Sequence, residues 1–170
     1  MYRPMILLDV DGVISLFGFD HRHPPRGRYV LVDGHLHFLS ETAATLIAQL
    51  AQRFELVWCT GWEDRADTHL PAMLGLPAGL AHLRFGAGGW AAQATSTVTR
   101  HWKLDAIDAF AGPDRPLAWI DDGHDQSCER WAAHRPGPTL LVATEPAVGL
   151  TDAHVLELDE WAASLTGRAG

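Results

Sequence analysis

The stretch that most constrains this chain is an apolar run that ends in two aspartates one residue apart. Met5–Leu8 are apolar, Asp9 and Asp11 follow, and Gly12 comes directly after them. Four apolar residues before a turn signal indicate a buried strand, which we expect to be the central strand of a parallel sheet. Functional groups of open α/β sheets lie just past the carboxyl ends of such strands. The alternative is a strand that simply ends in a polar turn.

The two aspartates need a partner at that strand end. Neighbouring carboxylates repel each other unless a cation or a proton is shared between them. Gly12 lets the chain turn and lets a ligand approach the backbone. The pattern argues against a calcium loop of the EF-hand type, because a strand is expected before the motif and the twelfth position is Asp20 instead of Glu.

Length and composition predict one domain over residues 1–170 with a real core. No apolar run approaches the ~18 residues of a membrane span, and the first residues do not resemble a signal peptide. The cysteines, Cys59 and Cys128, are too few for a disulfide framework and lack metal-binding spacing. We therefore expect a reduced, cytoplasmic protein without a membrane partner.

The charge balance bears on partners. The formal net charge of −8 argues against a broad grip on duplex nucleic acid, but it leaves a single nucleotide or a strand end open as a substrate. The chain contains twelve arginines and one lysine, Lys103. Because arginine is used at every other basic Lys or Arg position, the single lysine suggests that arginine could not replace Lys103 at its site.

A hairpin is expected soon after the first strand. Residues 15–27 are rich in Gly, Pro, His and Arg, and two β-prone runs joined by Asp33-Gly34 follow them. This segment, about residues 15–38, leaves the aspartate-bearing strand end and could cover it as a flap. Five basic residues in this segment could contact an anionic substrate: His21, Arg22, His23, Arg26 and Arg28. The alternative is that they form only a solvated basic loop.

The rest of the chain alternates between helix and strand patterns. Expected helices span about 40–54, part of 62–74, where Pro71 breaks the helix or begins a new turn, 103–110, 126–135 and most of the chain from 151. Expected strands are 55–59, 82–85, 117–120 and 139–142, while 86–99 is a loop and 154–158 is either strand or helix. This order predicts an α/β domain with a parallel sheet.

Chemically useful groups stand at three of the predicted strand ends and at one helix start. They are Asp9, Asp11, Thr60, Gly61, Lys103, Asp121 and Asp122. Carboxylates from two strands form an oxygen-only site that suits Mg²⁺, and a hydroxyl, a backbone N–H and a lysine suit phosphate oxygens. A strand-end aspartate beside the metal can act as a nucleophile, and the second aspartate can act as acid and base.

These residues carry a resemblance to the haloacid dehalogenase-like (HAD) superfamily, in four ordered motifs that cover nearly the whole chain. The motifs are Asp9-Val10-Asp11-Gly12-Val13, Trp58-Cys59-Thr60-Gly61, Lys103 and Ile120-Asp121-Asp122-Gly123. The resemblance implies a Rossmann-like parallel sheet of order 3-2-1-4-5 flanked by helices, and Mg²⁺-dependent phosphoryl transfer. The short segments between motifs imply a capless member with only the hairpin flap.

By position, the resemblance implies a role for each motif residue. Asp9 is the expected nucleophile and metal ligand. Asp11 is the expected general acid and base, and its backbone carbonyl is a metal ligand. Thr60, with Gly61 and Gly12, binds the phosphoryl group, and Lys103 offsets its charge. An aspartate at position 11 favours a phosphatase over a dehalogenase, because it protonates an ester leaving group and then activates water.

The second acidic pair leaves the metal ligand open. Asp122 is the expected direct ligand, with Asp121 supporting Lys103 or a metal-bound water. Many relatives place another acid a few residues further on, and Asp125 could fill that role.

A closer similarity narrows the expected substrates. The segment Pro146–Thr151, with Trp161 beyond it, is similar to small bacterial members grouped with the phosphatase-like domain of "Swiss army knife" RNA repair proteins. The expectation is a phosphomonoesterase acting on a phosphorylated small molecule, nucleotide or nucleic acid end. A non-catalytic phosphate- or partner-binding module and a phosphotransferase are the alternatives. Candidate site-lining aromatic residues are Trp62, Trp90 and Trp102.

Overall fold

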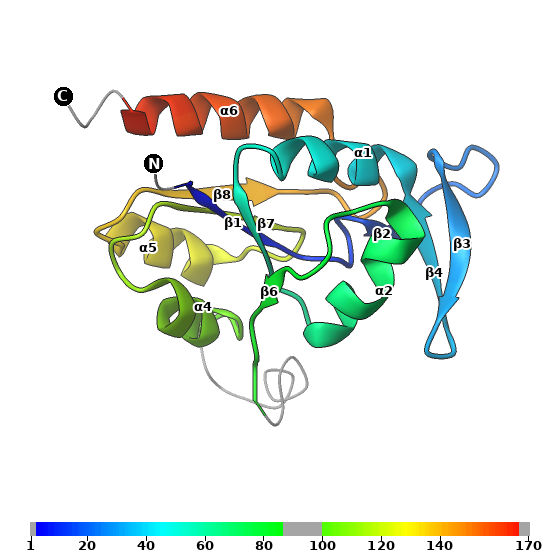
Figure 1. The fold of residues 1–170 in the computed structure, drawn as a ribbon, viewed down its shortest axis with the longest axis horizontal. Helices are drawn as coiled ribbons and strands as arrows, with labels where there is room; N and C mark the ends of the chain where they lie inside the picture. The colour runs from blue at the N-terminus through cyan, green and yellow to red at the C-terminus, as the bar shows by residue number, and fades with distance from the viewer. Residues whose placement is uncertain (1–2, 87–99, 167–170) are drawn as a thin grey trace.

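A five-stranded parallel sheet forms the centre of the computed structural model, which describes residues 3–86 and 100–166. Its strands are β1 (Met5–Leu8), β5 (Glu55–Trp58), β6 (Ala81–His82), β7 (Leu117–Asp121) and β8 (Thr139–Ala143). They run in the order β6-β5-β1-β7-β8, with β1 in the middle (Figure 1). Numbered along the chain within this sheet, that is the expected order 3-2-1-4-5. The predicted fold class is confirmed.

Helices cover both faces of this sheet. They are α1 (Glu41–Leu50), α2 (Asp64–Leu74), α4 (Leu104–Ala111), α5 (Gln126–His134) and α6 (Asp152–Thr166). Figure 1 shows α1 and α6 on one side of the sheet and α4 on the other. No described helix is both long enough and apolar enough to cross a membrane.

The β1 strand is apolar throughout because both of its faces are covered. Ile6 and Leu8 belong to a core cluster that includes residues of α1, α2 and α6. Met5 and Leu7 belong to a second cluster with residues of α4 and α5. All four side chains are almost fully buried, and burial of each contributes roughly 2 kcal/mol. This central position fixes Asp9 and Asp11 at the middle of the sheet's carboxyl edge.

A small antiparallel sheet lies beside the central one. It contains β2 (Ser15–Leu16), β3 (Gly27–Val32) and β4 (His35–Ser40) in the order β2-β4-β3. Asp33 and Gly34 both have positive φ, of 49° and 81°, which suits the tight turn of the predicted hairpin. The hairpin is confirmed, and β2 adds a strand where a loop was expected.

Three other expectations need correction. Pro71 does not break its helix: α2 continues to Leu74, and the one backbone hydrogen bond that proline removes lies in the last turns, while Leu70 stays buried. α1 ends at Leu50 instead of residue 54, and β6 is a two-residue strand that ends at His82. For residues 154–158, where both strand and helix were open, the structure shows a helix.

Most of the expected loop at 86–99, with Trp90, lies outside the described residues.

Candidate active site

The carboxyl ends of β1, β5 and β7 meet at one pocket of about 330 Å³. The residues that line it are Asp9, Asp11, Gly61, His101, Trp102, Lys103, Asp121, Asp122 and Gly123. Thr60 lies at the end of β5 and is 1% exposed. The structure therefore brings the predicted strand-end groups to one edge of the sheet, as the parallel topology requires.

Lys103 bridges the first and third of these strand ends. It directly precedes α4, and its buried Nζ lies 2.9 Å from Asp9 Oδ2 and 2.6 Å from Asp121 Oδ2. Burial disfavours the charged form, but attraction to the two carboxylates outweighs it and raises the pKa of Lys103 above its usual value. Since an ammonium group has three donors, two contacts with carboxylates leave one proton for a bound oxyanion.

Asp9 is held in place and is almost fully covered. Its Oδ1 accepts the backbone N–H of Val10 at 2.8 Å, while Oδ2 faces Lys103. Burial raises the pKa of Asp9 to about 7, although Lys103 opposes the rise. Repulsion from Asp121 adds to the increase. The site therefore holds more negative charge than one lysine balances.

Asp121 and Asp122 differ in how their carboxylates are used. Asp121 accepts hydrogen bonds from Lys103 Nζ, from Trp119 Nε1 at 3.0 Å and from Gly123 N at 2.9 Å. Burial opposes the ionised form, but Lys103 and the Gly123 N–H hold the pKa of Asp121 below its usual value. Asp122 is half-buried, and burial together with Asp121 raises its pKa.

The acidic groups form a set that fits a divalent cation. One carboxylate oxygen each from Asp9, Asp121 and Asp122 lie within 4.8 Å of one another. The donors are all oxygens, and three carboxylates face a single ammonium. Hard oxygen ligands with excess negative charge suit Mg²⁺.

Gly12 makes room for this set. Its φ is 77°, and a Cβ at this position would lie 2.3 Å from Asp122 Oδ2. Its N–H donates to the Ser15 carbonyl at 2.8 Å, so that group is already used inside the loop. The geometry therefore gives Gly12 the role of admitting Asp122, in addition to the turn expected from sequence.

Asp11 lies beside the acidic set and is held from the opposite side. Trp62 Nε1 donates to Asp11 Oδ2 at 2.9 Å, and His37 Nδ1 lies 3.8 Å from Oδ1. Burial lowers the pKa of His37, so this contact is not an ion pair at neutral pH. His37 is also 3.0 Å from Ser15 Oγ. Trp62 was a predicted lining residue, but sequence reasoning missed His37, for which the hairpin pattern was the only signal.

Asp125 is occupied elsewhere. Its Oδ1 accepts the backbone N–H groups of Ser127 at 2.8 Å and Cys128 at 3.1 Å, and the Ser127 hydroxyl at 2.6 Å. It is therefore the N-cap of α5. The cation-binding set found among the described residues does not include it.

The basic residues of the hairpin segment also separate. Arg28 donates to the Met73 carbonyl, and Arg26 lines a different cavity with residues of α1. Arg22 and His23 contact Asp20. Of the five candidates, His21 lines a pocket that reaches Asp11.

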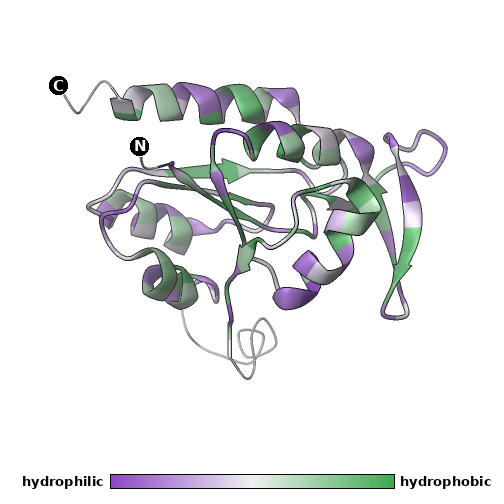
Figure 2. Cartoon of the chain, viewed as in Figure 1, coloured by the Kyte–Doolittle hydropathy of each residue, from purple (hydrophilic) through white to green (hydrophobic). Residues whose placement is uncertain are grey.

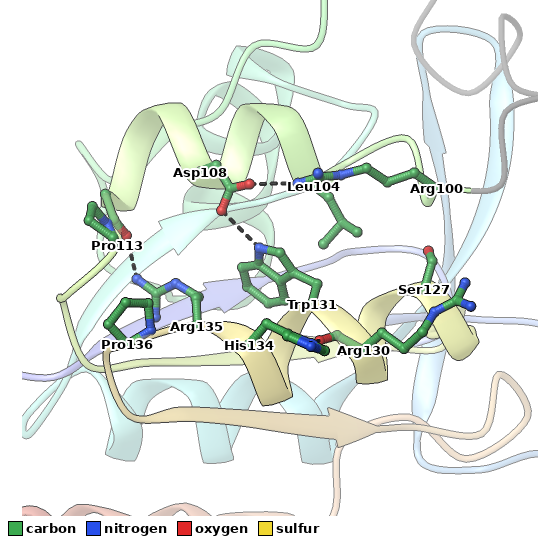
Figure 3. A pocket seen from close by; sticks show the side chains of 11 residues that line it. Arg100, Leu104, Asp108, Pro113, Ser127, Arg130, Trp131, His134, Arg135 and Pro136 are labelled. Carbon is green, nitrogen blue, oxygen red and sulfur yellow. Dashed lines mark hydrogen bonds and ion pairs between the residues drawn. The ribbon is translucent and has the colours of Figure 1, made fainter.

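A second cavity, between α4 and α5, lacks comparable chemistry (Figure 3). Its volume is about 670 Å³. Asp108 accepts hydrogen bonds there from Arg100 at 2.6 Å and from Trp131 Nε1 at 2.8 Å, and Arg135 donates to the Gly112 carbonyl. Because these polar groups bond to one another, we place the candidate active site at the sheet edge.

The family model described as the HAD domain in Swiss Army Knife RNA repair proteins matches residues 5–155. The chain belongs to this family. No curated protein matches the chain. Membership of a HAD domain family implies a hydrolase type of function, and the match extends over every motif that meets at the sheet edge.

Proposed function

We propose that this HAD domain is a Mg²⁺-dependent phosphomonoester hydrolase that acts through a phosphoaspartate on Asp9. The observation that carries the proposal is the position of Lys103 between Asp9 and Asp121, with Asp122 and Asp11 at the same opening. A nucleophile, a counter-charge, a cation-binding set and a proton donor then face one substrate. The family match supports the same chemistry.

In the first step, an oxygen of Asp9 attacks phosphorus and the bond to the leaving-group oxygen breaks. Asp11, in its protonated form, donates its proton to that oxygen. In the second step, Asp11 takes a proton from water as the water attacks phosphorus, and inorganic phosphate and free Asp9 are formed. Lys103, the Thr60 hydroxyl and the Gly61 N–H bind the phosphoryl oxygens.

Asp9, Asp122 and the backbone carbonyl of Asp11 would hold Mg²⁺, which supplies charge neutralisation at the phosphoryl group. The three donors on Asp121 support a role in orienting Lys103 or a metal-bound water. This matches the division that the resemblance implies for the two acids.

Phosphate release is the test of this proposal. The panel includes small phosphomonoesters, nucleotides and oligonucleotides with 3′- or 5′-terminal phosphates, because the family description names RNA repair proteins. We expect turnover with Mg²⁺, none with EDTA, and a loss of at least ~10³-fold in Asp9→Asn. Glu160→Gln, on the exposed side of α6, is the control carboxylate change.

If Asp9→Asn turned over substrate at the rate of the wild type, that result would contradict the phosphoaspartate route. Binding of Mg²⁺ and phosphate without turnover of any ester would favour the non-catalytic module instead.

A further inference from the structure

Asp11 lines two pockets. One is the acidic pocket that it shares with Asp9 and Lys103. The other has a volume of about 320 Å³ and lies against the small sheet and the loop that follows β2. Beyond Asp11, its walls include Phe17, Phe19, His21 and Tyr29. The two pockets therefore adjoin at the residue to which the proposed function assigns proton transfer.

The second pocket is built from aromatic rings. The Phe38 ring contacts Phe19 and Tyr29, with centroids 4.7 and 5.0 Å apart, which makes the wall firm. Tyr29 Oη lies 3.2 Å from His21 Nδ1, and this pair adds polar atoms to the wall. No lysine or arginine is among the lining residues.

Large apolar side chains around this pocket stand open to solvent. Phe17 is 52% exposed, Tyr29 51% and Leu36 66%. Figure 2 shows that β3 becomes hydrophobic toward its turn. Exposed apolar groups gathered at a pocket indicate a binding surface, whereas single ones are ordinary.

In the proposed reaction, the leaving group departs on the side of Asp11. Asp9 attacks phosphorus from one side, and in-line displacement puts the departing oxygen on the other side, where Asp11 protonates it. The remainder of the leaving group must then continue past Asp11. The aromatic pocket, which Asp11 also lines, is a space that could receive it.

We propose that the pocket lined by Phe17, Tyr29 and Leu36 binds the leaving group of the phosphate ester, and that this group is a nucleoside whose base stacks on the exposed rings. This inference rests on the proposed function. Aromatic side chains accept any base through its π-face, and the Tyr29–His21 pair offers hydrogen bonds to the base edge or the ribose. A lining without lysine or arginine suits a neutral nucleoside better than a second phosphate.

Paired substrates that differ only in the base provide the test. One arm compares adenosine 5′-monophosphate with ribose 5-phosphate. The other compares trinucleotides carrying a 3′- or 5′-terminal phosphate with the same trinucleotides lacking the terminal base. The first arm reports a free nucleotide and the second a strand end, and kcat/KM is measured with Mg²⁺ for each.

We expect the substrate with a base to be preferred by about tenfold or more in at least one arm. Phe17→Ala should reduce that preference by about tenfold. Leu31→Ala should keep it, because Leu31 is 66% exposed on the same hairpin but does not line the pocket. If esters are turned over but neither arm shows a preference for the base, the inference is overturned and the proposed function still stands.

A binding measurement separates the two proposals if no ester turns over. Adenosine is titrated into the wild-type protein, and the backbone amide signals of Phe17, Tyr29 and Leu36 are followed by NMR. Shifts at these residues that weaken in Phe17→Ala support the pocket even if the hydrolase proposal fails. Unchanged spectra at millimolar adenosine, without any preference in turnover, overturn it.

Discussion

Asp11 shows how much a single carboxylate depends on residues remote in sequence. Its indole donor, Trp62, follows β5, and the nearby imidazole of His37 comes from β4. The two rings also pack together, with centroids 4.6 Å apart. In the proposed reaction Asp11 is the general acid, and its oxygen must be aimed at the leaving group, so this contact would then bear directly on rate.

Trp62→Phe keeps an aromatic ring and removes the N–H that Asp11 accepts. We expect kcat to fall about tenfold, the equivalent of ~1.4 kcal/mol, with a smaller change in KM. Steady-state kinetics on the preferred ester measures this. Trp131→Phe is the matched control, because its indole also donates to an aspartate, Asp108, in the remote cavity. An equal loss of kcat in both variants would contradict the positioning role.

At the scale of elements, the start of α5 bears on a question that the sequence left open. Asp125 lies three residues after Asp122, close enough along the chain to be considered a metal ligand. Its carboxylate instead accepts from the first turn of the helix that follows. Capping requires a short oxygen-bearing side chain, whereas metal binding requires a carboxylate, so the two roles can be separated.

Asp125→Ser should keep the cap and Asp125→Ala should lose it. We expect the alanine variant to be less stable by about 1 kcal/mol, and the serine variant to lie close to wild type. Urea unfolding measures stability, and Mg²⁺ titration followed by calorimetry measures the metal. Both variants should bind Mg²⁺ as the wild type does. A serine variant that folds but fails to bind Mg²⁺ would make Asp125 a ligand.

Sequence patterns located the elements well where the pattern was local. The buried strand before Asp9, the Asp33-Gly34 turn and the Ser40 cap of α1 all appear as expected. The sheet order came from the family resemblance, because periodicity does not specify which strands pair.

The contacts that complete the site could not be predicted in the same way. Trp62 and Asp11 are separated by 51 positions, and no spacing rule links an indole to a carboxylate. Gly12 signalled a turn, but the close approach of Asp122 depends on the packing of two strand ends. The expected break at Pro71 was wrong, because helix propensity does not take into account that proline near the end of a helix removes only one backbone hydrogen bond.

At the scale of the whole molecule, the ionisation of the buried site affects how the stability of the fold depends on pH. The pKa of Asp9 rises on folding from its ordinary value of 3.8 to about 7, chiefly through burial. Between these values the folded protein holds a proton that the unfolded chain has released. Stability of the metal-free protein therefore falls as pH rises through this window. A bound cation would oppose this rise in pKa, because it favours the ionised carboxylate.

Asp9→Asn should therefore stabilise the protein in EDTA at pH 8. We expect Tm to rise by roughly 3 °C or more, which corresponds to ~1 kcal/mol in a chain of this size, and the gain to shrink toward pH 4. Thermal unfolding at the two pH values measures it. Mg²⁺ should raise Tm of the wild type at pH 8 and have less effect on the variant. A variant that is less stable than wild type at pH 8 would contradict this account.

The segment after β8 ties the loop after β1 in place. Thr144 Oγ1 donates to the Gly12 carbonyl at 2.9 Å, and Leu150 N donates to the Val13 carbonyl at 3.1 Å. During translation Asp9 and Asp11 are synthesised early. The two hydrogen bonds that hold the loop beside them cannot form until residues 144–150 have left the ribosome. The nascent chain should thus acquire the geometry of the proposed active site late in synthesis. A cut or a reading-frame loss before Thr144 should disable that site although its own residues are all present.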